Sequence, residues 1–120
     1  VTIVATGHLV WESLLAADEL EKQGLSCEII NIHTIKPLDE EIILKSVEKT
    51  GKIVTAEEHN YLGGLGESVA GMLARKRPTP QEFVAVQDTF GESGTPAELM
   101  HKYKIDSFAV IEAVKRILER

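Results

Sequence analysis

Short apolar runs and longer amphipathic stretches alternate along this chain. The apolar runs are rich in Val and Ile, as strands are, and they cover Val1–Thr6, Cys27–Ile32, Lys52–Glu57 and Glu82–Val86. The stretches between and after them repeat their apolar residues with the period of a helix. Because the runs are apolar at nearly every position, the pattern predicts parallel strands covered by helices on both faces of one sheet.

Glycine, proline and capping residues mark where the predicted helices begin and end. Gly24 and Gly51 end the first two helices, and Pro78 follows the third. The T-P-A-E sequence at 95–98 predicts the start of a short helix that runs to about Lys102, and Asp106 is a candidate cap for the last helix. We expect these residues to face the core: Val10, Leu14, Ala17 and Leu20 from the first helix, Ile43 and Val47 from the second (opened by Asp39, Glu40 and Glu41), Val69, Met72 and Leu73 from the third (Gly66–Arg77), and Val110, Val114 and Ile117 from the last.

These elements predict an α/β fold, a three-layer α/β/α sandwich around a mainly parallel sheet of four strands in the order 2-1-3-4. Ligands of such sheets bind at the carboxyl ends of the strands, where the winding reverses, here between the first and third strands. Three polar segments follow strands at this edge: Thr6-Gly7-His8, Glu57-Glu58-His59 and Phe90-Gly91-Glu92-Ser93-Gly94. The sequence therefore predicts that its most polar motifs gather on one rim.

Gly63-Gly64-Leu65-Gly66 precedes a predicted helix and admits two interpretations. Free amides at a helix start attract phosphate, but Val69 stands where the dinucleotide pattern needs a small residue, and Glu67 places a carboxylate in the first turn. The other interpretation is a tight turn that lets the helix pack closely on the sheet, and the residues favour it.

Two histidines face each other across the predicted rim. His8 and His59 are candidate general acids or bases, and with Glu57 and Glu58 they form a candidate metal site, although the spacing matches no metal motif. The alternative is a pair of interfacial or loop-capping histidines. Gly91-Glu92-Ser93 resembles half of a hydrolase elbow, but Thr95 replaces its second glycine, so the sequence opposes that activity.

Composition limits the class of protein. The 120 residues suffice for one domain, and the net charge of −6 argues against nucleic-acid binding. Apolar runs are too short for a membrane span. Cys27 is the only cysteine; we expect a plain buried thiol in a reducing, cytoplasmic setting. We expect Trp11 to pack in the core, and the start at Val1 suggests a fragment, 1–120, of a longer chain.

Four segments in this order, VTIVATG, INIHTIKPLDEE, IVTAEEHNYLGGLGE and DTFGESGTPAELMHKY, closely resemble the C-terminal domain of transketolases, especially the kind that is split into two polypeptides. The resemblance covers the whole chain and implies the Rossmann-like fold of that domain. Related C-terminal domains occur in the β subunits of 2-oxoacid dehydrogenases, where they dock partners, and in deoxyxylulose-phosphate synthases. Both remain alternatives, as does a small-ligand binder that uses the His8/His59 rim.

The resemblance implies an enzyme that transfers a two-carbon ketol unit between sugar phosphates, with thiamine diphosphate and Mg²⁺ as cofactors. In this family the cofactors lie between a pyrimidine-binding and a diphosphate-binding domain, which we expect as partners, together with a homo-oligomer. We therefore expect this domain to bind no cofactor or metal, to hold no catalytic residue and to be inactive alone. The signature positions carried over as interdomain or dimer contacts are Glu58, His59, Gly63, Gly64, Gly66, Gly91, Glu92 and Ser93; His8 joins them as a rim residue.

The resemblance also implies a fifth, antiparallel strand upstream of Val1 that pairs beside the second strand. Without it, Cys27–Ile32 is an uncovered edge, and such an edge is a template for pairing between molecules. We therefore expect this chain to self-associate through Cys27–Ile32.

Overall fold

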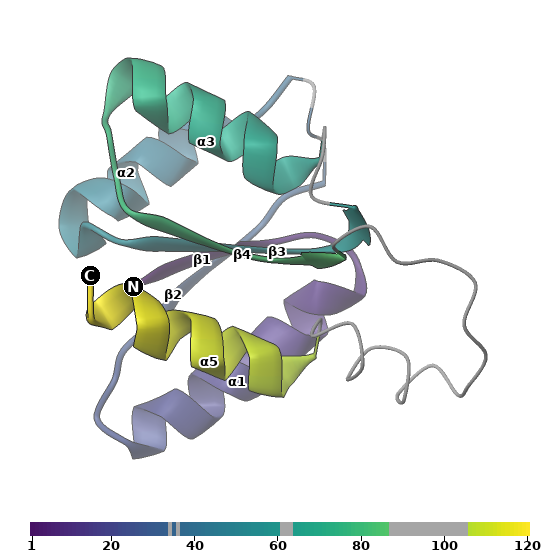
Figure 1. Ribbon diagram of the computed structural model, residues 1–120, viewed down its shortest axis with the longest axis vertical. Coiled ribbons are helices and arrows are strands. Elements are labelled where there is room, and N and C mark those ends of the chain that lie inside the picture. The colour runs from purple at the N-terminus through teal and green to yellow at the C-terminus, as the bar shows by residue number, and fades with distance from the viewer. Residues whose placement is uncertain (34, 36, 61–63, 87–105) are drawn as a thin grey trace.

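The computed structural model describes residues 1–33, 35, 37–60, 64–86 and 106–120 (Figure 1). Its elements are β1 (Thr2–Ala5), α1 (His8–Lys22), β2 (Glu28–Asn31), α2 (Glu40–Thr50), β3 (Ile53–Asn60), α3 (Leu65–Lys76), β4 (Gln81–Val86) and α5 (Ser107–Leu118). The four strands form one parallel sheet in the order β2-β1-β3-β4, which confirms the predicted fold class and strand order.

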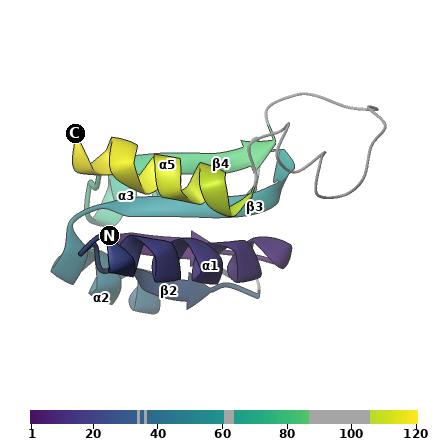
Figure 2. The ribbon, with the colours of Figure 1, turned by 90° about the horizontal axis from the view of Figure 1, so that it is seen from below.

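Helices cover both faces of the sheet, as Figures 1 and 2 show. Neighbouring residues of β1 point to opposite sides: Ile3 packs in a core with α1 and α5, whereas Val4 packs in a second core with α2 and α3. Both side chains are fully buried. The sheet is therefore the middle layer of a three-layer sandwich, and this explains why the strands read as continuous apolar runs.

The inner face of α1 differs from the prediction. The buried residues of this helix are Leu9, Ser13, Ala16 and Leu20, whereas Leu14 is 49% exposed and Trp11 is 57% exposed. Of the predicted row, Leu20 is buried and Val10 packs against the core as a partly buried residue, but Ala17 is only partly buried and Leu14 is exposed. The buried row is thus displaced by about one residue, and the prediction that Trp11 lies in the core was wrong. The small side chains of Ser13 and Ala16 allow α1 to lie close to the sheet, and an apolar pattern does not reveal this preference.

The other helices bury the residues that their periodicity predicted. Ile43 and Val47 of α2, Val69, Met72 and Leu73 of α3, and Val110, Val114 and Ile117 of α5 are all nearly or fully buried. Asp39 and Asp106 accept hydrogen bonds from the first turns of α2 and α5, through Ile42 N and Ala109 N. The predicted helix at Thr95–Lys102 lies outside the described residues.

The strands end later or earlier than the sequence indicated. β3 continues to Asn60, so Glu57, Glu58 and His59 lie within this strand, and its pairing with β4 is irregular between Ala56 and Asn60. β2 lies at an edge of the sheet, as predicted, and Cys27 beside it is half-buried, less than expected. Partial burial raises the pKa of the Cys27 thiol. No helix among the described residues is long and apolar enough to cross a membrane.

Candidate functional site

Glu57 closes the N-terminus of α3 from the neighbouring strand. Its side chain is almost fully buried, and its two carboxylate oxygens accept hydrogen bonds from the backbone N–H groups of Leu65 (2.8 Å) and Gly66 (2.7 Å). The residue before the helix, Gly64, offers no side-chain cap. The first N–H groups of a helix need partners and favour negative charge, so Glu57 supplies a cap from β3.

Glu58 does the same for α1 on the other side of the sheet. Its Oε1 accepts a hydrogen bond of 2.5 Å from the backbone N–H of His8, the first residue of α1. Gly7 precedes this helix with a φ of +57°, and a Cβ there would lie 3.0 Å from Glu58 Oε1. Because successive strand residues point to opposite faces, two adjacent glutamates cap two helices in different layers.

These two carboxylates stand where an α/β domain commonly holds phosphate. A phosphate at the start of either helix would compete with a carboxylate that already takes its N–H groups, and like charges would repel. The phosphate interpretation of Gly63-Gly64-Leu65-Gly66 is therefore disfavoured, by Glu57 more than by the Glu67 that the sequence pointed to.

Close packing of α3 on the sheet explains one of the glycines. A Cβ at Gly66 would lie only 2.4 Å from the Phe83 ring of β4 and 3.1 Å from Thr55 Oγ1 of β3. Gln81 donates to both Thr55 Oγ1 (3.1 Å) and the Gly66 carbonyl (3.0 Å), which ties α3 to the two strands. The predicted close approach of helix and sheet is confirmed at this residue.

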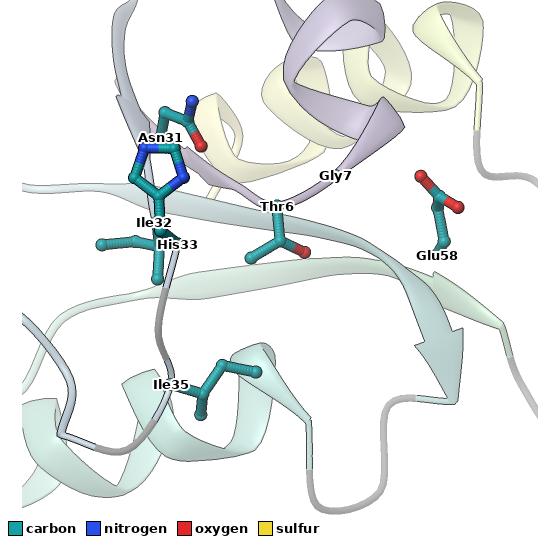
Figure 3. A pocket seen from close by; sticks show the side chains of 7 residues that line it. All are labelled: Thr6, Gly7, Asn31, Ile32, His33, Ile35 and Glu58. Carbon is teal, nitrogen blue, oxygen red and sulfur yellow. The ribbon is translucent and has the colours of Figure 1, made fainter.

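A cavity of about 330 Å³ opens at the carboxyl ends of β1, β2 and β3 (Figure 3). Polar atoms come from Thr6, Asn31, His33 and Glu58, while Ile32 and Ile35 provide apolar wall. Figure 3 shows Asn31 and His33 on one side and Glu58 far across on the other. The side chains of Thr6, Asn31 and His33 can each donate as well as accept a hydrogen bond. Glu58 is the one carboxylate of this lining, and it already accepts the His8 N–H.

The structure describes the side chain of only one of the two predicted histidines. The His8 imidazole is half-exposed and lies 3.6 Å from Glu12 Oε2 within its own helix. His59 lies on β3, and its side chain is outside the described part of the structure. Among the described residues, no three His, Cys, Asp or Glu side chains form a group that could hold a metal ion. Acid–base chemistry by His8 and His59 therefore stays a prediction.

The remaining signature residues fall in two groups. Gly64 is the N-cap residue of α3 and Gly66 lies in its first turn. Gly63, Gly91, Glu92 and Ser93 lie outside the described residues, with the whole Phe90–Gly94 segment. That these positions contact other domains stays a prediction. Sequence reasoning missed the capping role of Glu57 and Glu58 and the place of His33 in the cavity wall. The sequence did show that two helices lack a local cap, since Gly7 and Gly64 precede them, but it did not show which residues replace it.

The fold and this edge define a doubly wound α/β domain whose helix N-termini are closed by its own carboxylates. A family model described as "Transketolase, C-terminal domain" matches residues 1–110. The chain therefore belongs to the transketolase C-terminal domain family, as its motifs predicted.

Curated relatives contain this domain within longer chains. The chain is 45% identical over 120 residues to the 6-deoxy-6-sulfo-D-fructose transketolase subunit SqwH of Clostridium sp. (strain MSTE9), all of this chain aligning with 37% of that protein. It is 37% identical over 121 residues to the transketolase of Mus musculus, of which it covers 19%. The chain thus spans about a third of the length of the first relative and about a fifth of the length of the second. The 2-oxoacid dehydrogenase and deoxyxylulose-phosphate synthase alternatives are not favoured.

Solved structures agree with this assignment. A split-gene transketolase, described as an inactive β4 tetramer, superposes with a TM-score of 0.95 at 42% identity, covering 98% of this chain and 39% of that chain. The transketolase of Campylobacter jejuni superposes with a TM-score of 0.59 at 20% identity over 96% of this chain and 16% of that one, which shows a shared fold.

Proposed function

We propose that this chain is the non-cofactor-binding C-terminal domain of a thiamine-diphosphate-dependent transketolase that moves a two-carbon ketol unit between sugar phosphates. In this role the domain supports assembly and helps to enclose an active site that other domains build. Its partners are the pyrimidine-binding and diphosphate-binding domains of the same enzyme, and the assembly is a homo-oligomer of such units. A cytoplasmic location is part of the proposal and suits the single cysteine.

The closed helix N-termini at the switch point carry this proposal. Doubly wound domains that bind nucleotides or phosphates use free backbone N–H groups at this place. Here Leu65 N and Gly66 N donate to Glu57, and His8 N donates to Glu58. A domain that satisfies these groups internally is built to hold its own shape, and its contribution to the enzyme is structural.

The described residues do not fit thiamine diphosphate and its metal ion. A diphosphate needs donors and a divalent cation, and this rim presents the carboxylates of Glu57 and Glu58 and, among the described residues, no metal-ligating cluster. We therefore assign the ketol transfer itself to residues outside this domain.

The test uses the full polypeptide that carries these 120 residues, together with its partner polypeptide if the enzyme is split. With thiamine diphosphate and Mg²⁺, we expect ketol transfer from xylulose 5-phosphate to ribose 5-phosphate. Pyruvate with an acyltransferase core is the control reaction. Turnover of pyruvate and not of the sugar phosphates would contradict the proposal, and so would turnover of a sugar phosphate by this chain alone.

The donor sugar needs its own arm of the experiment. One relative is named for 6-deoxy-6-sulfo-D-fructose and another simply as a transketolase, and both align along this whole chain. Because the proposed role of this domain does not include substrate contact, 6-deoxy-6-sulfo-D-fructose should be tested as a donor beside xylulose 5-phosphate. Either donor is consistent with ketol transfer.

A further inference from the structure

Three large apolar side chains gather on the outer face of α1. Trp11 is 57% exposed, Leu14 is 49% exposed and Leu15 is 42% exposed. Residues three and four positions apart are neighbours on a helix surface, so these side chains form one continuous surface, here called the α1 patch. The opposite side of the same helix, with Leu9 and Leu20, is fully buried in the core. The α1 patch is therefore a second apolar face of a helix that already has one.

The α1 patch continues into a hollow beside it. A cavity of about 350 Å³ begins at Leu14 and reaches the segment before β2; its lining is formed by Leu14, Ala17, Asp18, Glu21, Ser26 and Cys27. On the other flank, α5 begins next to α1, since Glu12 Oε1 accepts a hydrogen bond from Ser107 N (2.8 Å). The following residue, Phe108, is 56% exposed. An apolar surface with an adjoining hollow has the shape of a contact site.

Other exposed apolar residues of the described chain do not gather in this way. Ile42 lies on α2 in the opposite layer, and Leu118 lies at the far end of α5. Single apolar residues are common on protein surfaces, whereas several large ones on one face are typical of interaction sites. Among the described residues, the α1 patch is thus the exposed apolar surface that is typical of an interaction site.

The charges around the α1 patch indicate which partner. Asp18, Glu19 and Glu21 border the patch and its hollow, and Lys22 lies 3.7 Å from Asp18 and 3.9 Å from Glu19. If two copies met through this face, their acidic borders would approach each other, and each chain already carries a net charge of −6. Like charges that face each other across an interface disfavour association, while opposite charges favour it.

We propose that the α1 patch is the docking surface for another domain of the same enzyme, one whose contact surface is apolar and bordered by Lys and Arg. This rests on the proposed function, because it takes the partner to be a transketolase domain outside these 120 residues. Relatives that align along this whole chain have it as 37% and 19% of their own length, so further domains accompany this one in them. Trp11 and Leu14 provide the apolar centre, since large central side chains carry most of the energy of an interface.

The test replaces both leucines of the patch in the full polypeptide, as Leu14→Lys with Leu15→Lys. Both sites are exposed and Lys is a good helix former, so the fold should be kept, as circular dichroism of the variant will show. Lys removes apolar contact and repels a basic border. Ile42→Lys is the matched control, because Ile42 is equally exposed at 45% but lies in the other layer. Sedimentation velocity and native mass spectrometry measure the association of domains or polypeptides.

We expect the double variant to weaken assembly at least tenfold and Ile42→Lys to leave it unchanged. Asp18→Lys should weaken it less, and the wild-type affinity should fall as salt rises. Unchanged assembly of the double variant overturns the inference, and so does a loss confined to self-association of this chain, which would make a second copy the occupant. Wild-type ketol transfer is measured in parallel. If the wild type shows no ketol transfer while the Lys variants still lose assembly, the proposed function is wrong and the docking surface is confirmed.

Discussion

At the scale of single residues, Gly66 is required by what lies opposite it and not by its backbone conformation. A Cβ there would lie 2.4 Å from Phe83, whereas a Cβ at Gly71 on the same helix would meet only Arg75 Nη1 at 3.5 Å. We expect Gly66→Ala to lower the free energy of unfolding by roughly 1–3 kcal/mol, the usual cost of overpacking. Gly71→Ala should raise it by up to about 1 kcal/mol, because alanine favours helix. Urea unfolding measures both, and equal effects of the two substitutions would contradict this explanation.

The buried carboxylate of Glu57 should contribute more than any exposed ion pair of this chain. Glu57→Ala leaves Leu65 N and Gly66 N without this acceptor, which we expect to cost about 3 kcal/mol of unfolding free energy. Glu57→Gln keeps the size and one oxygen and should cost less. Acetate should raise the melting temperature of Glu57→Ala more than that of the wild type, because it replaces the missing carboxylate. A Glu57→Ala variant as stable as the wild type would show that the cap is dispensable.

At the scale of elements, the sequence predicted the helices and strands better than the way in which their ends are closed. Asp106 was recognisable as a cap, and Asp39 as one of three acidic residues that open α2, because a local cap lies directly before its helix. The caps of α1 and α3 come from a strand about 50 and 8 residues away along the chain, through Glu58 and Glu57. Their position follows from strand pairing, which no local pattern contains.

The orientation of α1 shows the same limit. Apolar residues occur all around this helix, so the period alone allowed either Leu9 or Val10 to begin the buried row. Packing selected the row with Ser13 and Ala16, even though the buried Ser13 hydroxyl finds no hydrogen-bond partner in the part of the chain that the structure describes. A helix with two apolar faces therefore has an orientation that only the tertiary structure determines. This also explains why Trp11 was misplaced.

Ion pairs between Glu82 of β4 and two arginines at the C-terminal end of the chain predict that the stability of the protein depends on pH. Arg116 Nε and Arg120 Nη1 each donate to Glu82 at 2.8 Å. Partial burial raises the pKa of Glu82, but the hydrogen bonds from the two arginines outweigh it, and the pKa is lowered overall. A carboxylate whose pKa is lower in the folded protein than in the unfolded chain stabilises the fold. This stabilisation is complete at a pH above the pKa of the unfolded chain, near 4.3, and it is lost as the pH falls through the pKa of the folded protein.

We therefore expect Glu82→Gln to cost up to about 1 kcal/mol at pH 7, since the arginines are half-exposed and solvent screens the pairs. The difference from the wild type should shrink steadily as the pH falls below 4. Urea unfolding between pH 3 and 7 measures it. Glu112→Gln removes the same charge from an exposed site on α5 and controls for net charge. A difference in unfolding free energy between the wild type and Glu82→Gln that grows at low pH would contradict this prediction.

At the scale of the whole molecule, the order of strands was predictable because short parallel strands joined by helices leave few topologies. The same reasoning placed the polar motifs at one edge, and Thr6, Gly7 and Glu58 do line one cavity there. The role of the adjacent glutamates was not predictable, since the sequence offered them as candidate metal ligands beside His8 and His59, and they cap two helices. The distinction depends on which way two neighbouring side chains point, and on the N–H groups that they meet.

This arrangement makes a prediction about cofactors that separates the domain from the enzyme. Thiamine diphosphate is an anion, and the chain combines a net charge of −6 with carboxylates at the helix N-termini where a diphosphate would bind. We expect thiamine diphosphate with Mg²⁺ to leave the melting temperature of this chain unchanged, because a ligand stabilises only a native state that binds it. A ligand at 100 times its dissociation constant adds about 2.7 kcal/mol, which corresponds to on the order of 10 °C for a domain of this size. The full polypeptide with its partners is the positive control and should melt at a higher temperature with the cofactors. A shift of several degrees in the 120-residue chain itself would show that this domain holds the cofactor after all.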